Sequence, residues 1–405
     1  MTSGEFKLRD LGFSVYGPSL LYSVGTGAIL PVIALSARGL GATVATATLA
    51  ITLIGIGSLL TNVPASVLTA RFGERAAMIG AAAWATCGMG LALAAPVLAL
   101  PALAVPPLGV FAAGILMIGM AGAVFNLARQ SYLAEAVPVR FRARAMSTLG
   151  GVSRIGTFIG PFVSAAAMVW LGLPGAYWTG MAAMAAAAVV SLRIPDLAGG
   201  GRPAAGNGAV RPTIRSIAVS RARILATLGL GVLLISAVRA TRQAVIPLWS
   251  EQLGLDAPTA SVIYGLSGAV DMLVFYPAGK LMDRKGRVAV AVPAMVVMGA
   301  ALALLPLTAQ AWTLLAVAML LGFGNGIGSG IVMTLGADFS PRQGRPQFLG
   351  LWRLLSDAGV MGGPVVLAAM TGAVSLASGI WTVAALSFAG AAIFGYFIPR
   401  TPRSG

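Results

Sequence analysis

The sequence predicts an all-α membrane protein built from two similar bundles of six helices. The 405 residues are 58% hydrophobic and only 9% charged, whereas a soluble domain carries about 25% charged residues. The chain contains twelve apolar segments that are candidates to cross a bilayer, for which about 20 residues suffice. Landmark residues of the first half also recur in the second half at a constant offset.

The predicted spans are joined closely, and the joint at 173–175 is so short that its two spans must form a hairpin. The first apolar run is too long for the core of a signal peptide, so we expect an uncleaved membrane helix. A Gly-, Pro- and Arg-rich segment separates an N-terminal bundle (1–192) from a C-terminal bundle (224–405) and predicts a flexible cytoplasmic linker over 193–223. The spans are predicted at residues 13–37, 43–69, 76–95, 107–133, 145–171, 174–192, 224–249, 258–280, 288–309, 311–336, 347–371 and 376–398.

The charges between the spans predict the orientation of the chain. Basic residues occur in every second loop and at the C-terminus, whereas the alternate loops hold only Arg38, Glu251 and Asp256. Because basic loops stay in the cytoplasm, we expect a multi-pass protein of the cell (inner) membrane with both termini cytoplasmic. The basic loop residues are Arg71, Arg75, Arg140, Arg142, Arg144, Lys280, Arg284, Lys285, Arg287, Arg342, Arg345, Arg400 and Arg403.

The composition also excludes several classes of function. The net charge is +16, but the basic residues lie between apolar runs and form no single patch, so no nucleic-acid partner is expected. With no histidine in the chain, common zinc sites and histidine-based catalysis are excluded, and we expect neither a metal nor a cofactor. The one cysteine, Cys87, lies in an apolar run, which predicts a small buried residue.

An internal repeat relates the two halves. In each half an acid is followed three residues later by proline, and then by a glycine and a Gly-Pro pair. The matched residues are Glu135 and Asp338, Pro138 and Pro341, Gly156 and Gly359, Gly160 and Gly363, and Pro161 and Pro364, each 203 residues apart.

One loop carries a family signature. Residues 279–287 read G-K-L-M-D-R-K-G-R, which resembles the G-x-L-x-D-R-x-G-R motif of major facilitator superfamily (MFS) transporters. The corresponding loop at 66–75 keeps the arginines and the central glycine but has Ala70 in place of the aspartate. The resemblance implies the MFS fold of two pseudo-symmetric six-helix bundles, with a substrate site near the midplane between them.

The motif predicts a clasp at the cytoplasmic surface. Glycine permits the tight turn, and the motif's aspartate and arginines can pair with Glu135 and Asp338 at the ends of spans four and ten. Such a clasp would hold one closed state until the halves rock; the alternative is a turn with solvated charges. The predicted gating residues are Arg71, Gly73, Arg75, Glu135, Gly279, Asp283, Arg284, Gly286, Arg287 and Asp338.

The fifth span contains a glycine pattern that is similar to the so-called antiporter motif of the family. It reads Gly156-x-x-x-Gly160-Pro161, and the eleventh span repeats it at 359–364. Small residues four apart also let helices approach closely. Helix packing therefore explains the pattern as well as antiport does.

Seven charged residues are predicted inside the spans. Each costs about 2.5–3.5 kcal/mol at the bilayer centre, so each must face a wet cavity or pair with another charge. None lies on the third, sixth, ninth or twelfth span, which the resemblance implies face lipid. The seven are Arg129, Arg154, Arg239, Arg242, Asp271, Arg353 and Asp357.

The two acids among them, Asp271 and Asp357, are the candidates for proton coupling. Alternating contact with an arginine would load and release a proton, whereas a fixed structural ion pair is the alternative. Arg353 and Asp357 are four residues apart and are predicted to pair. Because the resemblance implies that spans five and eight are neighbours, Arg154 is the expected partner of Asp271.

Five arginines against two aspartates leave the predicted interior positive, which favours an anionic or neutral amphipathic substrate. Arg129, Arg239 or Arg242 would bind a carboxylate or phosphate in bidentate fashion. The predicted cavity residues are Tyr22, Thr26, Asn126, Arg129, Gln130, Arg154, Arg239, Arg242, Gln243, Tyr264, Ser267, Asn325 and Arg353.

The resemblance implies a secondary active transporter, and the likeness is to bacterial drug or metabolite:proton antiporters. We expect a monomer that exports a small organic molecule in exchange for protons. Proton-coupled uptake or exchange of an organic anion is the alternative, and a non-transporting membrane receptor is a more remote one. No nucleophile–base arrangement or phosphate loop predicts an enzyme.

Overall fold

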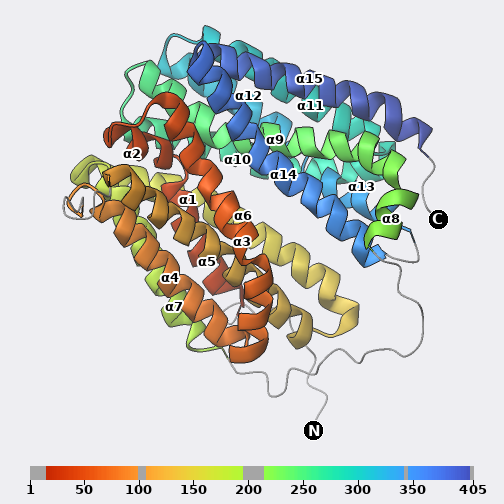
Figure 1. Cartoon of the computed structure of the whole chain (residues 1–405), viewed down its shortest axis with the longest axis horizontal. Coiled ribbons are helices and arrows are strands. Elements are labelled where there is room, and N and C mark those ends of the chain that lie inside the picture. Colours follow the sequence, from red (N-terminus) through yellow and green to blue (C-terminus); the bar gives the residue numbers. More distant parts are fainter. Residues whose placement is uncertain (1–14, 99–105, 195–213, 342–344, 402–405) are drawn as a thin grey trace. The chain divides into compact units, whose positions relative to one another are not determined.

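The computed structural model describes residues 15–98, 106–194, 214–341 and 345–401. Within these ranges the chain forms helices and short turns and no β-strand (Figure 1). The N-terminal segment and most of the predicted linker lie outside the described residues.

In the described part of the first half, seven helices correspond to the first six predicted spans. The first span is divided into α1 and α2 by a turn at Pro31, since proline cannot donate the hydrogen bond that would continue the helix. The helices are α1 (Gly17–Ile29), α2 (Ile33–Gly39), α3 (Val44–Phe72), α4 (Glu74–Ala94), α5 (Pro107–Ala136), α6 (Val139–Leu171) and α7 (Pro174–Ser191).

The second half repeats this arrangement with two departures from the prediction. A short helix, α8 (Ile214–Ser220), occupies part of the segment predicted as a flexible linker, and its Ile217 is buried. The tenth span is interrupted by a turn at 328–330, where Gly330 adopts a left-handed conformation that favours glycine. The other helices are α9 (Ala222–Gln252), α10 (Ala257–Lys285), α11 (Val288–Leu304) with a 3-10 turn (Leu305–Leu307), α12 (Ala311–Ile327), α13 (Ile331–Phe339), α14 (Arg345–Ala373) and α15 (Leu376–Arg400).

Eleven segments of the described chain are long and apolar enough to cross a membrane. They match all the predicted spans except the sixth, which is helix α7. Helix α7 has 18 residues and carries Tyr177, Trp178 and Thr179 near its start, and its mean hydropathy is below that of the eleven segments. It packs against α1, α4 and α6.

The described residues fall into two compact units, each with its own core. One lies within Met1–Ala42, Leu53–Pro203 and Ala257–Gly265, and the other within Thr43–Thr52, Ala204–Asp256 and Leu266–Gly405. Helices α3 and α10 therefore contribute to both units.

The repeated glycines are contact points between helices. In the first unit a Cβ at Gly160 of α6 would overlap the carbonyl oxygen of Val24 on α1, and in the second a Cβ at Gly363 of α14 would overlap that of Ala237 on α9. Gly156 and Gly359 make the equivalent contacts one turn earlier. The structure thus supports the helix-packing interpretation of this motif.

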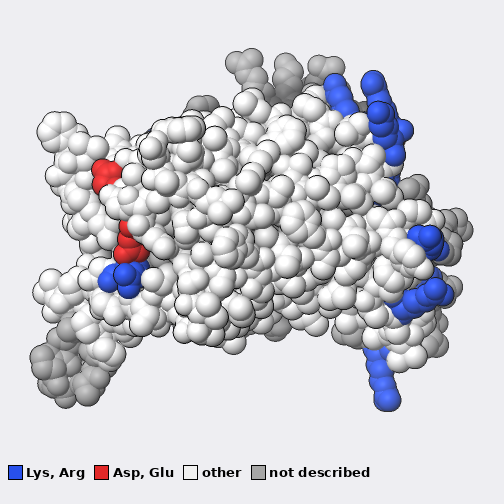
Figure 2. All heavy atoms as spheres, turned by 90° about the horizontal axis from the view of Figure 1, so that it is seen from above, with Lys and Arg blue, Asp and Glu red and all other residues white. Residues whose placement is uncertain are grey.

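One face of the molecule has a broad region without charged side chains. On the face in Figure 2 the Lys, Arg, Asp and Glu side chains lie toward the ends, and the middle carries none. Large apolar side chains such as Trp84 and Leu273 are exposed on the helices. Cys87 is also exposed, so the prediction of a buried cysteine is wrong: in a bilayer, an apolar sequence position can face lipid as readily as the core.

Candidate functional site

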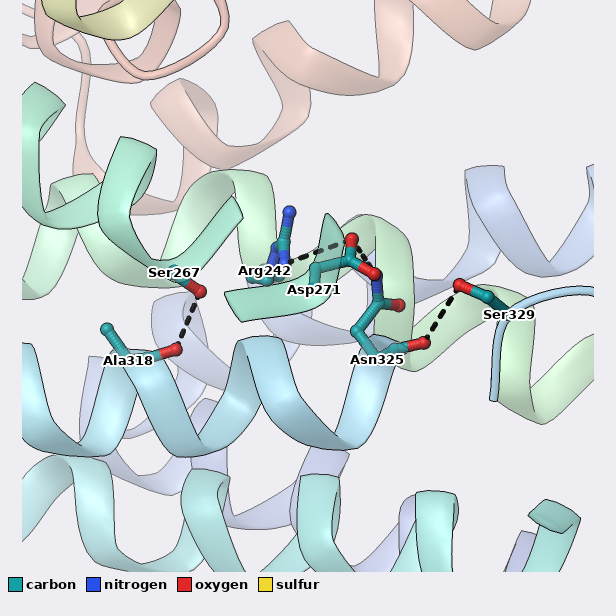
Figure 3. Close-up of polar contacts among 6 residues, drawn as sticks. All are labelled: Arg242, Ser267, Asp271, Ala318, Asn325 and Ser329. Carbon is teal, nitrogen blue, oxygen red and sulfur yellow. Dashed lines mark hydrogen bonds and ion pairs between the residues drawn. The ribbon is translucent and has the colours of Figure 1, made fainter. Parts of the chain in front are cut away.

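The second unit holds a cluster of charged and polar side chains around Asp271 (Figure 3). The side-chain amide of Asn325 donates a hydrogen bond to Oδ2 of Asp271 at 2.7 Å. Nη1 of Arg242 lies 3.8 Å from the same oxygen, and the side chains of Arg242 and Asp271 are only 13% and 15% exposed. One carboxylate within the apolar spans therefore contacts a charge and a neutral donor from two other helices.

Close packing of α10 against α12 brings Asn325 to Asp271. A Cβ at Gly322 would overlap the carbonyl oxygen of Ser267, and a Cβ at Gly326 would lie 2.7 Å from that of Asp271. The buried Ser267 hydroxyl donates to the carbonyl oxygen of Ala318 at 2.6 Å (Figure 3). Two glycines four apart thus let the helices approach until the Asn325 amide reaches the carboxylate.

Arg239 lies beside the break between α12 and α13. A Cβ at Gly328, the C-cap residue of α12, would lie 2.8 Å from Nη2 of Arg239. A cation at the C-terminal end of a helix meets the negative end of the helix dipole. Arg239 therefore lies where its charge stabilises the C-terminal end of α12.

The first unit contains a second polar cluster, around Arg129. Nη1 of Arg129 donates a hydrogen bond to the Ser153 hydroxyl at 2.7 Å, which joins α5 to α6. The ring of Tyr22 on α1 stacks on Phe125, one turn before Arg129, with centroids 3.9 Å apart. Tyr22 is 3% exposed, and its hydroxyl interacts electrostatically with the Arg129 guanidinium.

The predicted pair of Arg353 and Asp357 is confirmed, but it is looser and more exposed. Their side chains lie 3.9 Å apart and are 75% and 39% exposed. The predicted pairing of Asp271 with Arg154 involves both units and stays a prediction. In the described structure the partners of Asp271 include Arg242 and Asn325.

The remaining predicted cavity residues differ in how deeply they are buried. Asn126 and Gln130 are exposed, whereas Thr26, Arg154 and Gln243 are partly buried. Tyr264 is buried. The Thr26 hydroxyl donates to backbone carbonyl oxygens of its own helix.

The loop before α11 forms a salt bridge to α13. Nε of Arg287 lies 2.6 Å from Oδ2 of Asp338, and Nη2 lies 3.2 Å from Oδ1. This hydrogen bonding raises the pKa of Arg287. Gly286 has a φ of 84°, so the turn requires the glycine. The expectation that Asp338 pairs with an arginine of the motif is confirmed, and that arginine is Arg287. Asp283 and Arg284 of the same motif are exposed.

The first-half loop has the same turn but different chemistry. Gly73 has a φ of 82°. The next residue is Glu74, in the place of Arg287, and it accepts a hydrogen bond from Ser131 at 3.0 Å. Glu135 is exposed.

A separate cavity of about 480 Å³ lies among α3, α4 and α5. Leu68, Phe72, Trp84 and other mainly apolar side chains line it. It contains none of the predicted site residues and has no charged group in its lining.

The sequence of most of the chain matches a known family. The model of the Major Facilitator Superfamily matches residues 19–288 and 228–405. The chain belongs to the Major Facilitator Superfamily. No curated protein matches it.

Solved MFS structures share the fold at low sequence identity. The nucleoside transporter NupG is 14% identical, with 96% of this chain and 100% of that chain covered and a TM-score of 0.71. The D-xylose-proton symporter is 15% identical, with 96% and 98% covered and a TM-score of 0.72. The human organic anion transporter MFSD10 is 14% identical, with 96% and 100% covered and a TM-score of 0.66. These similarities confirm the predicted MFS fold.

Sequence reasoning named most residues of the two clusters but not all their contacts. Ser153 and Phe125 were not among the predicted site residues of this MFS protein, and the bond between Asn325 and Asp271 was not predicted. The repeat held a signal for Ser153, because it lies 203 residues before Ser356, which contacts Ser236 on α9 at 2.9 Å. Asp271 and Asn325 are 54 residues apart in the sequence, and no sequence pattern indicates that they are in contact.

Proposed function

We propose that this MFS protein is a secondary active transporter that exports a small organic molecule in exchange for protons, in the manner of drug or metabolite:proton antiporters. It acts as a monomer in the cell (inner) membrane, with both termini cytoplasmic. Residues 1–192 and 224–405 are its two halves. The observation that carries the proposal is the largely buried carboxylate of Asp271, held between Arg242 and Asn325.

A carboxylate within a membrane span is costly unless it has a partner or is protonated. The cost is about 2.5–3.5 kcal/mol at the centre of the bilayer, and protonation removes the charge that causes it. Protonation also ends the charge–charge attraction to Arg242, whose guanidinium can then contact another anion. A proton on Asp271 and a change in the contacts of Arg242 are thereby coupled.

Asp271 is a better coupling site than Asp357. The Asp357 side chain is 39% exposed and pairs at 3.9 Å with an arginine on its own helix. Such a pair forms and breaks with little consequence for other helices. The contacts of Asp271 join α10 to α9 and α12, so loss of its charge reaches three helices.

The test is flux across proteoliposomes with and without an imposed pH gradient, using a panel of organic substrates. We expect Asp271→Asn to abolish accumulation driven by the gradient and to retain exchange of substrate for substrate. Asp357→Asn is the matched control and should keep most of the driven flux. If both variants retain driven flux, proton coupling through these acids is wrong.

A second candidate function is proton-coupled uptake or exchange of an organic anion. It is favoured by Arg129, whose contacts among the described residues are with Ser153 and Tyr22 and include no acid. Structurally similar MFS proteins include one named an organic anion transporter and one named a proton symporter. The sign of the pH gradient that drives flux separates antiport from symport in the same experiment.

A further inference from the structure

We infer that Tyr22, Arg129 and Ser153 form a binding site for the oxyanion group of the transported molecule, a carboxylate or a phosphate. The inference rests on the proposed function, because it names the substrate class. It concerns the first unit alone, whereas the coupling cluster around Asp271 belongs to the second.

The site presents two hydrogen-bond donors that the described structure leaves unused. Nε of Arg129 and the hydroxyl of Tyr22 are buried, and neither has a hydrogen-bond partner among the described residues. A buried donor without an acceptor costs about 1–3 kcal/mol, and more when it is charged. An oxyanion can accept from both groups and would remove this cost.

The charge of Arg129 also lacks a counter-ion in the described chain. Among the described residues, its contacts are the hydrogen bond to Ser153 and the electrostatic interaction with Tyr22. By contrast, Arg242, Arg287 and Arg353 each lie within 4.0 Å of an aspartate. An uncompensated guanidinium in an apolar helix is expensive, so the site favours a ligand that brings a negative charge.

The neighbouring residues hold the two donors in place, and no side chain extends from Gly122 toward the Tyr22 hydroxyl. Stacking on Phe125 at an interplanar angle of 11° fixes the Tyr22 ring, and Ser153 fixes one end of the guanidinium. A Cβ at Gly122 would have no atom within 4 Å except the Tyr22 hydroxyl at 3.9 Å. Asn126, one turn along α5, is exposed and is placed to contact the rest of the ligand.

A purely structural role for Arg129 makes a different prediction. If the arginine only joins α5 to α6 through Ser153, its loss lowers stability without changing the preference for anions over neutral molecules. A binding role makes that preference depend on both Arg129 and the Tyr22 hydroxyl. The preference, not stability, is therefore the quantity to measure.

The experiment compares three probes on the purified full-length protein in detergent: benzoate, phenyl phosphate and the neutral isostere benzamide. Affinities come from calorimetry and from ligand-induced shifts in unfolding temperature. We expect wild type to bind at least one anion about tenfold or more tightly than benzamide, as for one charge-assisted hydrogen bond. Arg129→Gln should abolish the preference, and Tyr22→Phe, which keeps the stacked ring, should reduce it several-fold.

Arg223→Gln is the matched control, since it removes one exposed guanidinium from the other unit and should keep the preference. Two results would overturn the inference: no preference in wild type for either anion, or an unchanged preference in both Arg129→Gln and Tyr22→Phe. Because Tyr22→Phe changes a single hydroxyl, it remains informative if Arg129→Gln fails to fold. Anion binding without flux in proteoliposomes would refute the transport function and leave this site intact, and flux without anion preference would do the reverse.

Discussion

At the scale of single residues, the amide of Asn325 stabilises a carboxylate in an apolar span. Its hydrogen bond to Asp271 is 2.7 Å long, and bonds to charged groups contribute about 1.5–3 kcal/mol. We therefore expect Asn325→Ala to lower the free energy of unfolding by about that amount, as measured by denaturant titration in mixed micelles. Asn126→Ala removes an exposed asparagine and should change stability by less than about 0.5 kcal/mol. Equal effects of the two substitutions would contradict a stabilising role for this bond.

Contacts within one helix were predictable from spacing, but contacts between helices were not. Arg353 and Asp357 share a helix face because they are four residues apart, and the structure confirms their pairing. The contact of Asp271 with Arg242 depends on how α9 and α10 pack, which no residue spacing encodes. The sequence did place both residues inside predicted spans, because apolar runs of membrane-crossing length surround them.

At the scale of helices, close contact at glycine holds α14 against α9. A Cβ at Gly363 would overlap the backbone of Ala237, so Gly363→Ala must push the helices apart. We expect it to destabilise the protein by about 1–3 kcal/mol, although alanine favours the helix itself. Gly362→Ala is the matched control in the same turn, because nothing lies within 4 Å of its Cβ. Thermal unfolding in detergent measures both, and a stable Gly363→Ala protein would disprove the close contact.

The salt bridge from the α10–α11 loop to α13 offers a second test at this scale. A double-mutant cycle with Arg287→Ala and Asp338→Ala should give a coupling of about 1 kcal/mol, since both side chains are four-fifths buried and the contact is bidentate. The exposed pair of Arg353 and Asp357 is the control and should give about 0.3–0.5 kcal/mol. Couplings of equal size would show that burial adds nothing here.

Titration of Arg287 should not make this coupling depend on pH near neutrality. Its pKa is raised by the bond to Asp338. A raised folded-state pKa means that the stabilisation is complete below the unfolded pKa of arginine. It is lost only as pH rises through the higher folded value, far above neutrality. The coupling should therefore not fall between about pH 7 and pH 9 in the same titrations.

The helix breaks show the limit of hydropathy as a predictor of elements. Apolar runs mark the two ends of a span, but the turns at Pro31 and at 328–330 lie inside such runs. Proline and glycine were visible at both places, yet each also occurs within unbroken helices, as Pro161 does in α6. Local residue type permits a break, and packing decides whether one forms.

At the scale of the whole molecule, the halves repeat their packing and not their chemistry. The glycine contacts of α6 with α1 recur between α14 and α9. By contrast, Asp357 stands where the first half has Arg154, and Arg287 stands where it has Glu74. Backbone contacts depend on side-chain size, which the repeat keeps. Charges are free to change wherever the fold does not require them, so the fold was more predictable than the site.

The number of spans decides whether the two ends of the chain lie on the same side of the membrane. Twelve spans place them together and eleven place them apart, so the outcome depends on α7, the one predicted span that is not among the eleven segments. Its 18 residues extend about 27 Å at 1.5 Å per residue, close to the thickness of a bilayer core. It carries no charged residue that would oppose insertion.

We therefore expect α7 to cross the membrane. Alkaline phosphatase, which is active only outside the cytoplasm, should be active when fused after Gly172 and inactive when fused after Arg193, in a bacterial host. A fluorescent protein that matures only in the cytoplasm should show the reverse. The pair of sites brackets α7 alone, because Gly172 precedes it and Arg193 follows it. The same reporter response at both sites would mean that α7 does not span, and the predicted cytoplasmic position of both termini would then be wrong.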